Sequence, residues 1–427
     1  MIPLNADQKE AIRLLHEFVA GPNSFFLLKG QAGTGKTTCI NTFVEETNLE
    51  VALTAPTNKA TGVLRAMAEE KGVTAECRTI YSILGLRIVK DSEFAQVEAI
   101  GECDAMAYSV VVVDEGYMLQ RSVFGYAQEA ALEGVKFIVM GDPYQLPPVG
   151  EKESMVSTIS LGYTLTKVER HDNQILDLSN SLRKAQDEGT KPKFKTDHGD
   201  DGEGVYCVNS KKFVKLLGNA FTSDTHKDHP EHFKCITWTN NAARFYNERI
   251  REFLYGEEAN SRKFFEGESV IAAHPILDFR SSDDDFVMST DEEAVVQSVE
   301  VVEHPMFKQL MCYHLVMDTR LGTEEAVHGY VIHESSEKAY KKLLGVMADE
   351  ARSKRGSWSS FWALKDQMFM DIRPSHAITT HRSQGSTYPV TFADSVDFLS
   401  NRRSLEAKQC VYTACTRASQ KLIILTR

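Results

Sequence analysis

Residues 30–37 carry the clearest chemical signal in the chain. They read Gly-Gln-Ala-Gly-Thr-Gly-Lys-Thr and follow an apolar run at 25–28 that is typical of a buried strand. Where such a loop opens a helix, successive backbone N–H groups surround a polyphosphate at the positive end of the helix dipole. The lysine can reach the β- and γ-phosphates, and the last hydroxyl can ligate Mg²⁺. The segment therefore predicts a site for ATP or GTP, formed by Gly30, Gly33, Thr34, Gly35, Lys36, Thr37 and Thr38.

Two carboxylates and an amide follow later apolar runs. The four valines at 110–113 precede Asp114 and Glu115, and Gln145 lies in a proline-rich loop at 141–149. We expect Asp114 to hold Mg²⁺ together with Thr37, and Glu115 to act as general base on the attacking water. The amide of Gln145 can hydrogen-bond both a phosphate oxygen and water, so it can distinguish ATP from ADP.

The elements around these residues predict an α/β protein. Apolar runs at 25–28, 51–53, 110–113 and 137–140 alternate with helical stretches, the pattern of a parallel sheet covered by helices. Ligands bind such sheets at the carboxyl ends of the strands, where all three motifs lie. A second α/β unit follows a polar linker at 184–204, with strands expected at 205–208, 235–238, 377–380, 390–393 and 422–425.

Two insertions are also expected. Residues 86–102 alternate around a polar centre and predict a small β-hairpin with Phe94 near its tip. Residues 266–333 contain short strand-like runs with acidic turns, and 334–370 are helical in character and carry Trp358, Phe361 and Trp362. Those aromatic side chains could stack on nucleic-acid bases, although packing into a core is the commoner role of such residues.

Composition limits the protein class. The chain has 427 residues, enough for two to four domains, and a net charge of −12, which disfavours a uniformly basic nucleic-acid surface. Its eight cysteines form no Cys-x-x-Cys pair, so neither a zinc ribbon nor a disulfide framework is expected. No apolar run approaches the ~18 residues of a membrane span, and no secretory signal is recognisable. We expect a protein of the cytoplasm, bacterial or of a phage-infected host.

The motifs resemble, in kind and in order, those of superfamily 1 helicases. The similarity runs nearly from end to end and is strongest to the 1B branch, which includes RecD-like and Pif1-like enzymes and the phage Dda helicase. In its size and in having no nuclease motif, the chain resembles the phage Dda helicase. The similar segments are 4–8 (Q motif), 53–60 (Ia), 78–84, 114–115 (II), 141–149 (III), 165–170 (IV), 379–387 (V) and 411–418 (VI).

The resemblance implies roles for residues outside the first sheet. Arg170 and Arg417 would approach the γ-phosphate from the far side, with Gln8 on the adenine and with Gln384 and Gly385 at the nucleotide. An arginine in this role contributes roughly 10³–10⁵ in rate. Hydroxyl and amide donors would hold a DNA backbone, and aromatic residues would contact bases. The candidates are Pro56, Thr57, Asn58, Lys59, Thr79, Ser82, Phe94, Trp238, Thr239, Asn240, His381, Ser386 and Thr387.

The resemblance also implies the domain plan and the activity. We expect two RecA-like parallel-sheet domains in tandem: 1–183, with the hairpin at about 86–103, then 184–265 and 371–427 on either side of an SH3-like β insert and helical arm at 266–370. The implied cofactors are ATP and Mg²⁺. The implied partners are single-stranded DNA and duplex junctions, with a single-strand-binding protein or replisome component as a further partner, and the expected state is a monomer without membrane contact. Phe94 would be a wedge between base pairs.

Other functions stay open at this level. A P-loop kinase or GTPase would lack a second sheet domain with its own arginine motif. A single-strand translocase or remodelling module would hydrolyse ATP on DNA without separating strands, and an RNA-directed helicase would depend on the 2′-hydroxyl. We favour an ATP-dependent DNA helicase of replication or recombination. Its 5′→3′ polarity is implied by the resemblance alone.

Overall fold

The computed structural model describes residues 4–89, 96–168, 174–277, 286–319 and 326–426. The chain divides into two compact units. The first comprises Met1–Arg87, Ala99–Tyr246 and Ala377–Arg427, and the second comprises Ile88–Glu98 and Asn247–His376. Both of the large parallel sheets belong to the first unit.

The first sheet has six strands in the order β3-β2-β6-β7-β1-β8, and all of its pairings are parallel. The inner strands β2 and β6 are buried along their whole length, and β7 and β1 over most of theirs, which explains their apolar sequences. The strands are β1 (Phe25–Gly30), β2 (Val51–Ala55), β3 (Glu76–Thr79), β6 (Val110–Val113), β7 (Lys136–Gly141) and β8 (Gly162–Leu165). The helices of this part of the chain are α1 (Ala6–Ala20), which precedes β1, and α2 (Lys36–Glu46), α3 (Asn58–Lys71), α4 (Ile80–Ile83) and α5 (Arg121–Leu132), with the 3₁₀ turn η2 (Gly116–Met118).

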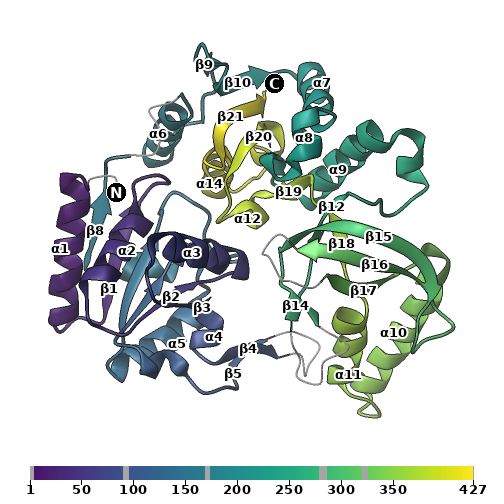
Figure 1. Ribbon diagram of the computed structural model, residues 1–427, viewed down its shortest axis with the longest axis horizontal. Coiled ribbons are helices and arrows are strands. Elements are labelled where there is room, and N and C mark those ends of the chain that lie inside the picture. The colour runs from purple at the N-terminus through teal and green to yellow at the C-terminus, as the bar shows by residue number, and fades with distance from the viewer. Residues whose placement is uncertain (1–3, 90–95, 169–173, 278–285, 320–325, 427) are drawn as a thin grey trace. The chain divides into compact units, whose positions relative to one another are not determined.

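The second sheet also has six strands, in the order β19-β11-β20-β21-β10-β9, and only β9 runs antiparallel to its neighbour. In Figure 1 the C-terminal strands, in yellow, lie beside strands from the middle of the chain, in teal. The strands are β9 (Asp197–His198), β10 (Gly204–Val208), β11 (Phe233–Thr237), β19 (Ala377–Thr379), β20 (Tyr388–Asp394) and β21 (Ala418–Leu425). The helices are α6 (Gln174–Asp187), α7 (Ser210–Phe221), α8 (Asp224–Asp228), α9 (Asn240–Tyr255), α12 (Thr380–Ser383), α13 (Ser395–Phe398) and α14 (Ser404–Cys415).

The expected fold class is confirmed, with local differences. The edge strands β3 and β8 do not stand out in the sequence because they are short and only partly buried. The segment expected to be a linker from residue 184 begins as helix, since α6 continues to Asp187 and packs against α14, β10 and β21. The expected hairpin is the two-stranded sheet of β4 (Leu86–Val89) and β5 (Gln96–Ala99).

The second unit is built on a five-stranded antiparallel sheet in the order β17-β16-β15-β12-β18. Apolar side chains from one face of these strands form a separate core around Val270, Leu315 and Met317. The elements are β12 (Ser269–Ala272), β15 (Glu293–Glu303), β16 (Met311–Thr319), β17 (Val327–Ile332), β18 (Ile372–Pro374), the short pair β13 (Ile276–Leu277) and β14 (Phe286–Met288), α10 (Glu337–Arg352), α11 (Trp358–Trp362) and a π-turn at Ala363–Met368.

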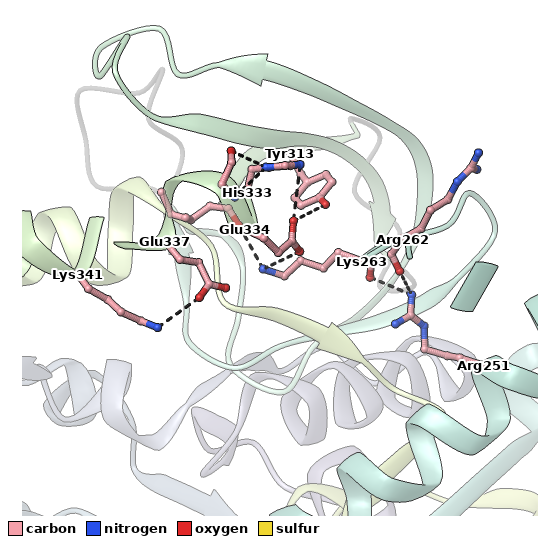
Figure 2. A network of polar contacts seen from close by, with 10 residues as sticks. Arg251, Arg262, Lys263, Tyr313, His333, Glu334, Glu337 and Lys341 are labelled. Atoms are coloured by element: carbon pink, nitrogen blue, oxygen red, sulfur yellow. Dashed lines mark hydrogen bonds and ion pairs between the residues drawn. The ribbon is translucent and has the colours of Figure 1, made fainter. Parts of the chain in front are cut away.

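A polar network joins the strands of this unit to the start of α10 (Figure 2). The Tyr313 hydroxyl donates to Oε2 of Glu334 at 2.7 Å, and the Lys263 ammonium lies 4.0 Å from Oε1 of the same carboxylate. Lys263 also donates to the carbonyl of Ile332 at 3.2 Å. The partly exposed positions of these groups mean that the network orients the segments more than it stabilises them.

A more deeply buried ion pair lies where the chain enters this sheet. Nε of Arg251 is 2.8 Å from Oε1 of Glu268, whose side chain is fully buried, and Nε2 of His376 is 3.9 Å from the same oxygen. Burial raises the pKa of Glu268 to about 7, with Arg251 opposing the rise. This carboxyl therefore titrates close to neutral pH.

All eight cysteines are free thiols, and most of them are buried. Burial raises the pKa of Cys39, in the helix after the phosphate loop, to about 12. None of the described helices is both long and apolar enough to cross a lipid bilayer.

Candidate active site

The loop between β1 and α2 depends on two glycines for its backbone conformation. Gly33 and Gly35 have φ angles of 83° and 82°, which residues other than glycine rarely adopt. A Cβ on Gly35 would also collide with the side-chain nitrogen of Gln8. The loop thus leads into α2 with its N–H groups gathered at the helix N-terminus, the arrangement that binds phosphate.

Side chains of the loop are held by its own carbonyl groups. The Lys36 ammonium donates to the carbonyls of Gly30 at 2.7 Å and Gln31 at 3.2 Å. The Thr34 hydroxyl donates to the carbonyl of Gln31 at 2.9 Å. Lys36 therefore lies over the loop, where a phosphate chain would meet it.

Gln8 connects the first helix to this loop. It forms a capping box with Asn5 at the start of α1, accepting from the Asn5 N–H at 3.1 Å. Its buried side-chain nitrogen donates to the carbonyl of Thr34 at 3.3 Å. The residue that the resemblance assigns to the adenine is thus fixed directly against the phosphate loop.

Asp114 and Glu115 are adjacent carboxylates at the end of β6, and Glu115 has an unusual backbone conformation. Oδ1 of Asp114 accepts from the Glu115 N–H at 2.8 Å, and Glu115 has a φ of 50°, a left-handed conformation that is strained for a non-glycine residue. Loss of surrounding water raises the pKa of both groups. For Glu115 the neighbouring Asp114 adds to the rise, whereas Arg417 and Lys36 oppose it. A carboxyl with a raised pKa is suited to accept a proton near neutral pH.

The loop after β7 carries the buried side-chain amide of Gln145. Gln145 is 5% exposed, and within the described residues its side-chain oxygen has no hydrogen-bond partner. The loop is held in place by Asp142, whose Oδ1 accepts from the Tyr144 N–H at 3.1 Å. A buried acceptor that lacks a donor fits a bound water or nucleotide, so the residues present suit ATP and its magnesium ion.

Residues from the second sheet domain contact the first-sheet motifs directly. The hydroxyl of the buried Tyr412 donates to Oδ2 of Asp142 at 2.6 Å, and the side chain of Gln384 donates to the Leu146 carbonyl at 3.3 Å. A Cβ on Gly385, whose φ is 74°, would lie 3.5 Å from the Cβ of Ala60 in α3. Motifs V (379–387) and VI (411–418) in the second sheet domain thus contact motifs Ia (53–60) and III (141–149) in the first.

Arg417 is held rigidly at the end of α14. It is 4% exposed, and its guanidinium donates to the carbonyls of Thr413 at 3.1 Å and Ser386 at 3.2 Å and to the Thr416 hydroxyl at 3.2 Å. Its charge acts on Glu115, as does that of Lys36. The charges of two cations that follow strands or helices of different sheets therefore both favour the ionised form of this carboxylate.

Arg183 of α6 is a residue of this site that the sequence did not identify. Its Nη1 donates to Oε1 of Gln31 in the phosphate loop at 2.8 Å, and its guanidinium lies 4.4 Å from the ring centre of Tyr144. Its Nε is buried without a hydrogen-bond partner within the described part of the chain. A neighbouring cavity of about 310 Å³ has walls that include Gln31, Ala32, Ile175, Ser179, Tyr412 and Thr416.

The nucleic-acid candidates of the first sheet lie at helix starts. Thr57 caps α3, its hydroxyl accepting from the Ala60 N–H at 3.2 Å, and Pro56, Asn58 and Lys59 adjoin it. Thr79 caps α4 in the same way, accepting from the N–H of Ser82 at 3.1 Å.

Some of these groups have protein partners. The hydroxyl of Ser82 accepts from the guanidinium of Arg78 at 2.7 Å. The Lys59 ammonium lies 5.9 Å from the ring centre of Tyr388 in β20, which brings the first-sheet candidates close to motif V.

The candidates of the second sheet gather at the carboxyl ends of its strands. Trp238 and Thr239 follow β11, and their N–H groups donate to one oxygen of Asp397 at 2.6 and 2.9 Å. His381 follows β19, and burial lowers its pKa, which favours the neutral imidazole. The remaining candidates are Asn240, at the start of α9, the buried Ser386 and the exposed Thr387.

Two residues of the predicted site, Arg170 and Phe94, lie outside the described residues. The aromatic residues of α11 are half-buried and contact one another, with ring centres 5.1 Å apart for Phe361 and Trp362. The Lys365 ammonium lies 4.4 Å from the Trp362 ring centre. The α11 aromatics thus form a surface cluster rather than a closed core.

Comparison with known proteins places the two sheets in described families. Residues 3–201 match the model described as an AAA domain, and 374–425 match that of the UvrD-like helicase C-terminal domain. The chain is 25% identical to an uncharacterized protein of Acanthamoeba polyphaga mimivirus, over 98% of this chain and 99% of the relative. It is 23% identical to the ATP-dependent DNA helicase dda of Enterobacteria phage T4, over 98% and 96%. The Pif1 helicase from Bacteroides, solved with ADP-AlF3 and ssDNA, superposes with a TM-score of 0.53 at 15% identity, over 99% and 92%.

Proposed function

Because the chain belongs to the superfamily 1B helicases of the RecD/Pif1-like branch, we propose that it uses ATP hydrolysis to move 5′→3′ along single-stranded DNA and to unwind duplex DNA. The observation that carries the proposal is that the positive charges of Lys36 and Arg417 both lower the pKa of Glu115. Each cation comes from a different sheet, so a nucleotide between them binds the two sheets to one another.

The hydrolytic step follows from the groups at this point. Water attacks the γ-phosphorus, Glu115 accepts the proton that water loses, and the bond to the ADP oxygen breaks. Lys36, Arg417 and Arg170 offset the charge that spreads over the γ-phosphoryl oxygens. When bound by Thr37 and Asp114, Mg²⁺ supplies Lewis-acid stabilisation of the phosphate oxygens.

The contacts between the two sheet domains provide a route from hydrolysis to movement. Tyr412 binds Asp142, and Gln384 binds the carbonyl of Leu146, so both contacts reach the loop that carries Gln145. Loss of the γ-phosphoryl group changes the environment of Gln145 and loosens this loop. Alternate tightening and loosening of the two sheet domains is what a translocating motor needs.

The DNA strand lies across the carboxyl edges of both sheets in this proposal. Donors at Thr57 and Thr387 hold phosphates without reading sequence, which explains how a protein with a net charge of −12 binds DNA. Phe94 at the hairpin acts as the wedge. We assign three domains: 1–183, 184–265 with 371–427, and 266–370. We propose that the protein acts in replication or recombination in the cytoplasm. It would act as a monomer, together with a single-strand-binding protein or replisome component.

Unwinding of partial duplexes with either a 5′ or a 3′ single-stranded tail tests the proposal. The unmodified protein should separate the 5′-tailed duplex in the presence of ATP and Mg²⁺, and Lys36→Ala should separate neither. Preference for the 3′ tail would refute the polarity. ATP hydrolysis that DNA stimulates without any strand separation would indicate a translocase or remodelling module instead.

A further inference from the structure

A cavity lies at the carboxyl ends of two neighbouring strands of the second sheet. It has a volume of about 390 Å³ and is lined by Trp238, Ser400, Asn401, Arg402, Arg403 and Glu406. Trp238 follows β11, and the other five residues lie between α13, which follows β20, and the first turn of α14. Because β11 and β20 pair in parallel, the cavity lies at the edge of the sheet where α/β proteins bind ligands.

The carboxylate of Asp397 forms hydrogen bonds that join the two segments lining the cavity. Oδ2 of Asp397 accepts from the N–H groups of Trp238 at 2.6 Å and Thr239 at 2.9 Å, and Oδ1 accepts from the Thr239 hydroxyl at 2.9 Å. Asp397 belongs to α13, whereas Trp238 and Thr239 follow β11. The two loops are therefore fixed relative to one another, and the cavity is formed before any ligand enters.

Asn401 offers a donor that the protein does not use. Its side chain is 8% exposed, and its oxygen accepts from the Arg403 N–H at 2.9 Å. Its side-chain nitrogen has no hydrogen-bond partner among the described residues. An unpaired buried donor is unfavourable, so an acceptor on a ligand in the cavity would relieve a cost that the protein alone carries.

The rim of the cavity carries a surplus of positive charge. Nη1 of Arg403 lies 3.3 Å from Oε2 of Glu406, so these two charges largely offset one another. Arg402 is exposed and forms no ion pair within the described part of the chain. The uncompensated charge at the rim, next to the flat indole of Trp238, matches a ligand that has both an aromatic ring and a phosphate.

We infer that this cavity holds one unpaired nucleotide of a bound DNA strand, with the base stacked on Trp238, a base acceptor at the Asn401 nitrogen and a phosphate at Arg402. The inference rests on the proposed function and makes it more specific. Every base has a stacking face and at least one acceptor atom, so the site takes any base. It therefore provides a grip on the strand that does not select sequence.

The fluorescence of Trp238 tests the stacking directly. The chain has three tryptophans, so the double variant W358F/W362F leaves Trp238 as the sole indole reporter. Addition of a dodecamer of thymidine without ATP should quench this fluorescence, whereas an abasic dodecamer of equal length should not. Unchanged fluorescence on saturation with the thymidine dodecamer would overturn the inference. Equal quenching by free thymidine monophosphate at the same nucleotide concentration would overturn the assignment to a strand.

Binding measurements on variants give a second, independent readout. By fluorescence anisotropy of a labelled thymidine dodecamer, Trp238→Ala should weaken binding roughly 5- to 150-fold, the range for loss of one base stack. Trp238→Phe should recover most of the affinity because a smaller aromatic face remains. For the abasic dodecamer the alanine variant should bind as the unmodified protein does. Phe253→Ala removes an exposed aromatic side chain that does not line the cavity, so it is the matched control, and its affinity for both oligomers should be unchanged.

The outcomes separate this inference from the proposed function. If Trp238→Ala binds the thymidine dodecamer normally while DNA still stimulates ATP hydrolysis, the nucleotide pocket is wrong and the helicase activity stands. If the unmodified protein neither binds the dodecamer nor hydrolyses ATP faster in its presence, the proposed function is wrong and the pocket assignment falls with it.

Discussion

Replacing Arg183 by alanine tests a residue that the structure, and not the sequence, brings to the nucleotide. The change removes a charged hydrogen bond of 2.8 Å to Gln31 and a guanidinium that lies 4.4 Å from the Tyr144 ring centre. The hydrogen bond is worth roughly 1.5–3 kcal/mol and the cation–π contact roughly 0.5–2 kcal/mol. Their sum, about 2–5 kcal/mol, is the upper limit of the transition-state stabilisation that the variant can lose, and it corresponds to a turnover lower by at most roughly 30- to 5,000-fold.

The assay is steady-state ATP hydrolysis at saturating single-stranded DNA, with nucleotide affinity measured in parallel. We expect Arg183→Ala to lower turnover with much less effect on ATP affinity, and Arg183→Lys to fall between, because it keeps the charge but not the planar fork. Arg13→Ala is the matched control, since the ion pairs that Arg13 forms with described residues are exposed pairs within one helix and contribute little. A folded Arg183→Ala protein with unchanged turnover would refute the role of this arginine in coupling the two sheets.

Three further predictions concern other parts of the molecule. Lys36→Ala should abolish ATP hydrolysis, because the ammonium over the loop is lost; measurable turnover in a phosphate-release assay would contradict the site. Tyr412→Phe removes the 2.6 Å hydrogen bond to the buried Asp142, and should lower the free energy of unfolding by about 1–3 kcal/mol and weaken the link between DNA binding and hydrolysis. An unaltered denaturation curve would argue against that bond. The folded-state pKa of Glu268, about 7, exceeds its ordinary value of 4.5, so its stabilisation is fully present below pH 4.5 and is lost as pH rises through 7. Between pH 5 and 8, the free energy of unfolding of Glu268→Gln should therefore fall by about 2–3 kcal/mol less than that of the unmodified protein. Parallel pH profiles of the two proteins would contradict this.

The parts of the site that were predictable from sequence are those formed by contiguous residues. The phosphate loop follows a buried strand and opens a helix as expected, and Asp114 and Glu115 follow a buried strand as expected. In each case the chemistry and the backbone that positions it are encoded within a few residues. The tandem parallel sheets were predictable for the same reason, because buried strands of this kind are continuous apolar runs.

The parts that were not predictable depend on contacts between distant segments. Arg183 lies in an amphipathic helix and meets Gln31 across 152 residues of sequence, and nothing in the local pattern distinguishes it from a surface arginine. The pocket at Trp238 is likewise completed by residues 400–406, far along the chain. The edge strands β3 and β8 carry too few buried residues to stand out from loops.

The most direct test of the central claim, that cations from both sheets act on one phosphoryl group, is single-turnover hydrolysis of bound ATP by Arg417→Ala, with ATP affinity measured on the same protein. We predict hydrolysis slower by roughly 10³–10⁵-fold with affinity nearly intact, since the arginine acts mainly on the charge that develops in the transition state. Hydrolysis at the unmodified rate by a folded Arg417→Ala protein would contradict the claim.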